Sequence, residues 1–120
     1  MKNKIISLSG ILKVFAILFI ALSISSGCSK SNDTTQTPGA NEVLIQSFAF
    51  SPSTITVAVN TTITWTNKDA AAHTVTSDNG LFDSGSLSTN ATYTHQFTTL
   101  GTFNYHCTFH SSMLAKVVVQ

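Results

Sequence analysis

The sequence predicts an all-β fold, an antiparallel sandwich or barrel built from about seven short strands. Short segments alternate apolar and polar side chains with a period of two, the spacing that turns one face of a strand toward a core. Threonine is abundant, and its β-branched side chain favours a pleated surface over a long helix. Turn-forming residues separate the segments, and the sequence contains no internal repeat.

The first three expected strands lie in the N-terminal half of the folded part. They cover residues 43 to 50, 54 to 59 and 61 to 66. Asn60 is expected to form the turn between the second and the third, because Asn tolerates the left-handed backbone conformation better than most residues. The alternation directs one set of apolar side chains inward: Ile55, Val57, Val59, Ile63 and Trp65.

The C-terminal half supplies the remaining strands, which we expect at residues 72 to 78, 91 to 100, 101 to 107 and 114 to 120. Residues 79 to 90 are the longest irregular connection. Side-chain parity divides the strand before the last into an inward row and an outward row. The inward row is Phe103, Tyr105 and Cys107, and the outward row is Asn104 and His106.

Residues 1 to 27 are predicted to be an export signal. Lysines precede a short apolar run at residues 14 to 22, and small residues follow at Ser25, Ser26 and Gly27. The run is well short of the roughly 20 residues that span a bilayer as a helix. The segment resembles the lipobox of bacterial lipoproteins, which implies a lipid on Cys28. The alternative is a signal that is cut near Gly27 without lipidation.

Residues 28 to 41 are interpreted as the lipidated cysteine and a flexible tether. They are polar, lack aromatic residues and contain Pro38 and Gly39, so they cannot bury enough apolar surface to fold. A coil of this length reaches about 20 Å from its anchor. The folded domain is therefore expected to cover residues 42 to 120. A domain this small gains from a bound metal or a cross-link.

Charge and cysteine content narrow the possible functions. Residues 28 to 120 contain three lysines, no arginine and five acidic residues, a net charge of −2. Nucleic-acid binding requires clustered cations, so this class is excluded. Exported proteins usually pair their cysteines, but a lipid on Cys28 would leave Cys107 without a partner. A free thiol in oxidising surroundings is vulnerable unless it is buried or bound by metal.

A metal site is predicted at the end of the chain. Cys107, His110 and Met113 follow the spacing C-x2-H-x2-M, so their donor atoms can converge on one point. His73 is the candidate for a fourth ligand. A thiolate and imidazoles with a weak thioether suit copper in both oxidation states. Zinc prefers a closed tetrahedron of strong donors and has no use for methionine.

Five motifs extend this pattern over residues 43 to 120. They are F-x-F-S-P at 48 to 52, W-T-N-x-D at 65 to 69, H-T-V-T-S-D at 73 to 78, F-D-S-G at 82 to 85, and G-T-F-x-Y-H-C-T-x-H-x-x-M at 101 to 113. With them the chain resembles the cupredoxins, particularly the small amicyanin and plastocyanin group. The resemblance implies a Greek-key β-sandwich of about seven to eight strands. It also implies one type 1 copper ion bound by His73, Cys107, His110 and Met113.

The same resemblance implies an electron carrier, not an enzyme. Electrons would pass through the exposed edge of His110 to transiently bound redox partners, a donor and an acceptor. The residues available for an apolar patch there are Phe109, Leu114 and residues 70 to 72. We expect a monomer in the bacterial periplasm or cell envelope, held at a membrane by lipid on Cys28.

The chain departs from the family pattern around the ligands. Ala72 stands where a proline usually precedes the first histidine, and Phe109 and Ser111 replace prolines that often flank the second. Thr74 replaces an asparagine that braces the cysteine loop in plastocyanin and amicyanin. Its backbone N–H is still expected to reach the sulfur, and such bonds tune a metal site. None of these changes removes a ligand.

Other readings remain open at this point. The same ligands would serve copper storage or delivery, and a sandwich without metal is a further alternative. A catalytic copper site would need an open coordination position, and a hydrolase built on Ser111 or Ser112 lacks a nearby acid and a nucleophile elbow.

His95 is interpreted as a core or boundary residue, and His106 as a surface residue or an outer neighbour of the site.

Overall fold

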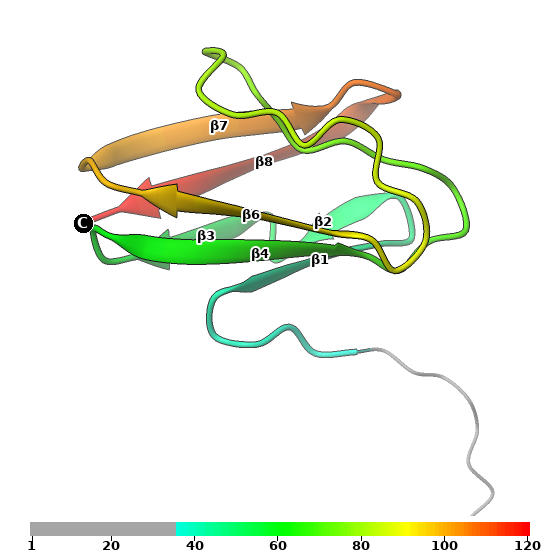
Figure 1. Cartoon of the computed structure of the whole chain (residues 1–120), viewed down its shortest axis with the longest axis horizontal. Helices are drawn as coiled ribbons and strands as arrows, with labels where there is room; N and C mark the ends of the chain where they lie inside the picture. Colours follow the sequence, from blue (N-terminus) through cyan, green and yellow to red (C-terminus); the bar gives the residue numbers. More distant parts are fainter. Residues whose placement is uncertain (1–35) are drawn as a thin grey trace, which may run out of the picture. The chain divides into compact units, whose positions relative to one another are not determined.

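The computed structural model describes residues 36 to 120, which form two four-stranded sheets packed face to face (Figure 1). One sheet has the order β2-β1-β4-β6, with β1 at Glu42–Gln46, β2 at Ala49–Ser51, β4 at Thr61–Asn67 and β6 at Thr92–Phe97. The other has the order β3-β8-β7-β5, with β3 at Thr54–Val57, β8 at His110–Val119, β7 at Gly101–Cys107 and β5 at Thr76–Ser77. The predicted all-β sandwich is confirmed.

The expected export signal, Cys28 and most of the tether lie outside the described residues. Within residues 36 to 120, no helix has the length and apolar character needed to cross a membrane.

Two strand pairs are parallel, β1 with β4 and β3 with β8. The expectation of an antiparallel sandwich is therefore wrong at these pairs. The chain crosses between the sheets after β2 and again after β3, so β4 returns beside β1 in the same direction. Apolar and polar residues alternate in the same way in both kinds of pairing, so the sequence pattern does not distinguish them.

The first expected strand, residues 43 to 50, is wrong as a single element. The chain forms β1, turns at Ser47 and Phe48, and returns as β2, with Gln46 opposite Ala49. Both turn residues have a positive φ, 54° at Ser47 and 58° at Phe48. Hairpin turns of this kind normally contain Asn-Gly or Asp-Gly. Ser-Phe gives no such signal, and a distant side chain, Asp69, holds the turn by accepting both of its N–H groups.

The core lies between the sheets and confirms most of the expected inward side chains. Ile55, Val57, Ile63 and Trp65 are buried, whereas Val59 lies beyond the end of β3 and is 40% exposed. Asn60 forms the expected turn with a φ of 69°. The core cluster is Val43, Ile45, Phe50, Ile55, Val57, Ile63, Trp65, Val75, Phe82, Leu87, Phe97, Tyr105, Cys107, Met113, Val117 and Val119.

The expected strand at residues 72 to 78 is reduced to β5 and an isolated bridge between His73 and Leu87. The long connection between β5 and β6 accounts for this, because it folds back along the segment. His73 and Leu87 exchange both backbone hydrogen bonds, and the N–H of Val75 donates to the hydroxyl of Ser84. This connection therefore fixes the backbone that carries His73.

Candidate metal centre

Three of the predicted ligands come from the same end of the sandwich. His73 follows β4, Cys107 ends β7 and His110 begins β8. In Figure 1 the arrowheads of β4 and β7 point to this end. The last expected strand begins at His110, earlier than the predicted residue 114, so only Thr108 and Phe109 turn between the two strands. An irregularity in the ladder at His106 and Cys107 sets Cys107 directly opposite His110.

The donor atoms of these three residues converge. The sulfur of Cys107 lies 3.7 Å from Nδ1 of His73 and 3.6 Å from Nδ1 of His110. All three ligand atoms lie within 4.8 Å of one another. First-row metals such as zinc are bound by imidazole at about 2.0–2.1 Å and by thiolate at about 2.3 Å, which at a trigonal angle separates the donors by about 3.7 Å. The three side chains therefore fit a single metal ion.

Burial supports a ligand role for Cys107. Cys107 is 1% exposed and has no disulfide partner among the described residues, and His73 beside it is 0% exposed. Met113 is also buried, at 2% exposed, three residues after His110 on β8. Ligation by Met113 stays a prediction.

Thr74 braces the cysteine, as the sequence predicts. Its backbone N–H donates to the sulfur of Cys107 at 3.3 Å. Its hydroxyl also accepts the N–H of Thr108 at 2.8 Å, which holds the turn that follows the cysteine. A threonine hydroxyl thus supplies the bracing contact that the family pattern assigns to asparagine.

Asp69 is a site residue that the sequence analysis missed. Its Oδ2 lies 2.9 Å from Nε2 of the His73 ring, so Nε2–H donates to the carboxylate and Nδ1 keeps its lone pair toward Cys107. Histidine ligands usually have such a partner, which fixes the tautomer and the ring orientation. The signal available in the sequence was the position of this carboxylate, four residues before a candidate ligand.

The Asp69 carboxylate is strongly hydrogen-bonded. Oδ1 accepts the N–H of Ser47 at 2.7 Å, and Oδ2 accepts the N–H of Phe48 at 2.9 Å. Burial by itself raises the pKa of this carboxyl, but the two turn N–H groups and the His73 ring outweigh it, and the pKa lies below its ordinary value. Asp69 is therefore an anion under physiological conditions.

Phe48 is the second residue that the sequence analysis missed at the site. Its ring meets both imidazoles nearly edge-on, with centroids 5.4 Å from His73 and 5.0 Å from His110. The F-x-F-S-P motif includes Phe48, but nothing in the motif indicates this contact.

The profile of the cupredoxin-like domain family matches residues 14 to 119. The chain belongs to the cupredoxin family. It is 33% identical over 87 residues to amicyanin-alpha of Methylorubrum extorquens, covering 68% of this chain and 73% of that protein. It is 34% identical to amicyanin of Paracoccus denitrificans over 87 residues, 68% of this chain and 66% of the other. Among solved structures, a reduced Cu(I) form of an amicyanin mutant superposes with a TM-score of 0.64 at 32% identity, covering 72% of this chain and 87% of that one.

The two other histidines of the folded part stay outside the ligand cluster of this cupredoxin. His106 lies on the outer face, where its Nδ1 is 2.7 Å from Oδ1 of Asp78. His95 lies at the edge of the core between Phe82 and Phe97, with ring centroids 4.8 Å and 4.9 Å away. Burial lowers the pKa of His95. Both positions agree with the sequence interpretation.

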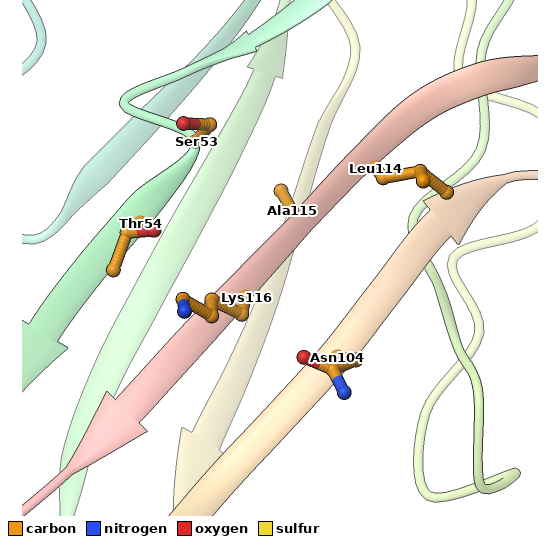
Figure 2. A pocket seen from close by; sticks show the side chains of 6 residues that line it. All are labelled: Ser53, Thr54, Asn104, Leu114, Ala115 and Lys116. Carbon is orange, nitrogen blue, oxygen red and sulfur yellow. The ribbon is translucent and has the colours of Figure 1, made fainter.

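Leu114, which was expected in the apolar patch around His110, belongs to a different surface. It pairs with His106 on the outer face of its sheet and lines an open hollow of about 280 Å³ there (Figure 2). The other residues lining the hollow are Ser53, Thr54, Asn104, Ala115 and Lys116. None of them is a member of the ligand cluster, so this hollow is separate from the metal centre.

Proposed function

We propose that this cupredoxin binds one copper ion as a type 1 centre and carries single electrons between redox proteins. The observation that carries the proposal is the convergence of two imidazole Nδ1 atoms on the Cys107 sulfur at 3.6 and 3.7 Å. One thiolate with two imidazoles suits copper. The similarity to two proteins named amicyanin supports the same assignment.

Each residue has a distinct task in this proposal. Cys107, His73 and His110 would hold the copper ion, and Met113 would serve as a weak fourth donor. Copper bound there would alternate between Cu(I) and Cu(II). Three of the four proposed donors, His73, Cys107 and Met113, are buried, and this packing would keep them in a similar arrangement in both states, so little structure would have to move when an electron arrives or leaves.

His110 is the proposed route for the electron. It is partly exposed, whereas His73 is fully buried. Phe48 and Phe109 are each 54% exposed at this end of the molecule, and Ala70 and Ala72 are also exposed. A small apolar surface without clustered charge suits transient contacts, which bury less than about 1,200 Å².

We further propose that the protein is exported, works as a monomer in the cell envelope and is held at a membrane by lipid on Cys28. The basic and apolar start of the chain and the small residues before Cys28 support this. Mass spectrometry of the mature N-terminal peptide tests it. A diacylated Cys28 peptide is expected, and an unmodified N-terminus near residue 28 would contradict the anchor.

An electron carrier and a copper delivery protein differ in how they release metal. We expect the copper-loaded protein to undergo repeated reduction and reoxidation, by ascorbate and ferricyanide, without losing copper to a chelator between cycles. Loss of the metal on each reduction would favour delivery. Turnover of a substrate at the centre would contradict the assignment as a carrier, because the proposed ligand set leaves no open coordination position.

A further inference from the structure

Phe48 occupies a position that core packing does not explain. Phe48 is 54% exposed, so it is not part of the core. Instead the ring lies edge-on to both His73 and His110, at interplanar angles of 81° and 86°. The two imidazole centroids are 4.8 Å apart. The phenyl ring therefore lies over the pair of imidazoles that converge on Cys107.

The backbone beneath this ring is held in a conformation that its own sequence does not favour. Ser47 and Phe48 both have left-handed φ values, 54° and 58°. This conformation is unfavourable for Ser and especially for Phe, so it persists where surrounding contacts impose it. Here those contacts are the two N–H groups donated to the carboxylate of Asp69, at 2.7 and 2.9 Å.

The same carboxylate holds the buried ligand. Oδ2 of Asp69 accepts from Nε2 of His73 while it accepts from the N–H of Phe48. The position of Asp69 is itself fixed, because its N–H donates to Oδ1 of Asn67 and its carbonyl accepts the hydroxyl of Thr89. One anchored carboxylate thus ties the His73 ring and the Phe48 turn together.

We propose that Phe48 is a cap on the metal centre, and that Asp69 is the positioning residue that keeps this cap closed over His73 and His110. The cap excludes water and competing ligands from the gap between the two imidazoles, and so it sets the rate at which metal leaves. This inference rests on the proposed function for the presence of the metal, but the contacts that make the cap belong to the chain alone.

Phe109 provides a matched control. It is also 54% exposed and precedes His110 directly, yet its ring forms no aromatic pair with either imidazole, whereas the ring of Phe48 pairs with both. Phe48→Ala and Phe109→Ala remove the same ring with the same exposure from the same end of the molecule. A difference between them therefore reports the cap and not the general loss of an exposed aromatic side chain.

The test uses the full-length protein, purified in detergent and loaded with Cu(I), and follows copper transfer to excess bicinchoninate. We expect Phe48→Ala to lose copper about tenfold faster than wild type, the factor implied by losing two edge-on aromatic contacts. Phe109→Ala should stay within about twofold of wild type. Equal rates for the two variants would overturn the proposal. Urea unfolding of each metal-free variant shows whether it folds, and Phe48→Leu, which keeps most of the bulk, replaces Phe48→Ala if that variant does not.

Asp69 is tested through its dependence on Phe48. Asp69→Ala should also speed copper loss, and the double variant with Phe48→Ala should lose copper no faster than Asp69→Ala alone, since both changes open the same cap. Fully multiplicative effects of the two substitutions would contradict a positioning role for Asp69.

A metal-free readout separates this inference from the proposed function. In apo protein, diethyl pyrocarbonate should modify His73 slowly, because the residue is 0% exposed. Modification should be about tenfold faster in Phe48→Ala and unchanged in Phe109→Ala. If the wild type fails to bind copper but the three proteins show this pattern of His73 modification, the proposed function fails and the cap stands. If copper binds as proposed and His73 is equally protected in both variants, the cap fails alone.

Discussion

The backbone N–H of Thr74 donates to the sulfur of Cys107 across 3.3 Å, although 33 residues separate the two in the chain. The hydroxyl of the same threonine accepts the N–H of Thr108, so Thr74 holds both the ligand and the turn that follows it. A single residue beside His73 thereby links the segment of one ligand to the segment of the next.

Thr74→Val tests the contribution of the Thr74 hydroxyl to stability. The substitution removes the acceptor of the Thr108 N–H and keeps the hydrogen bond from the backbone N–H of residue 74 to the sulfur of Cys107. We expect the free energy of unfolding of the metal-free protein to fall by about 1 kcal/mol, since the Thr108 N–H loses its protein partner. Urea unfolding followed by circular dichroism measures the change. Thr74→Ser keeps the hydroxyl and should stay close to wild type. A valine variant as stable as the serine variant would show that the contact contributes nothing.

His95 should make the stability of the protein depend on pH. Burial lowers its pKa in the folded state below the ordinary 6.5. As the pH falls below about 6.5, the unfolded chain therefore binds a proton at His95 more readily than the folded chain, so stability that is present above that pH is lost as the pH falls. In His95→Gln the decrease between about pH 6.5 and pH 5 should be smaller. Urea midpoints of the metal-free proteins across this range test the difference, and identical slopes would contradict it.

Phe82 and Leu81 are neighbours with opposite environments in the connection that pairs with the His73 segment. Phe82 is 5% exposed and packs against Trp65, His95, Phe97 and Tyr105, whereas Leu81 is 50% exposed. Phe82→Ala should lower the free energy of unfolding by about 3–5 kcal/mol. Leu81→Ala should change it by less than about 0.5 kcal/mol. Similar losses in the two variants, measured by urea unfolding, would mean that this connection does not contribute to the core.

Period-two alternation was enough to predict the fold class and most of the core. Ile63, Trp65, Tyr105 and Cys107 are buried as expected and Phe103 is partly buried, because alternation reports which side chains face a core. It did not reveal where a strand breaks. The turn at Ser47 and Phe48 depends on the carboxylate of Asp69, a contact between residues more than 20 positions apart that no local pattern contains.

The ligand cluster was predictable for a different reason. Cys107 and His110 lie close together in the sequence, and a thiolate without a cysteine partner requires a chemical role. His73 was placed as a ligand from its chemistry and from the family resemblance, and its Nδ1 lies beside the sulfur. Asp69 and Phe48 were missed because their roles follow from packing around the ligands. Carboxylates and exposed aromatic residues are common without any site nearby.

Met113→Leu separates axial ligation from core packing. Leucine has a similar volume, so the stability of the metal-free protein should change by less than about 1.5 kcal/mol. If Met113 is a copper ligand, its loss disfavours Cu(II) more than Cu(I) and raises the reduction potential, by about 59 mV for each tenfold change in relative affinity. Cyclic voltammetry of the two copper proteins measures the shift. An unchanged potential would remove Met113 from the ligand set.

The most direct test of the account is the spectrum of the full-length protein with one equivalent of Cu(II). Because the Cys107 sulfur lies beside two imidazole Nδ1 atoms, wild type should become intensely blue and show narrow parallel hyperfine splitting in electron paramagnetic resonance. Cys107→Ser should lose both features. A wild-type sample that stays colourless under oxidising conditions, or that gives the broad splitting of an ordinary tetragonal copper site, would contradict a type 1 centre.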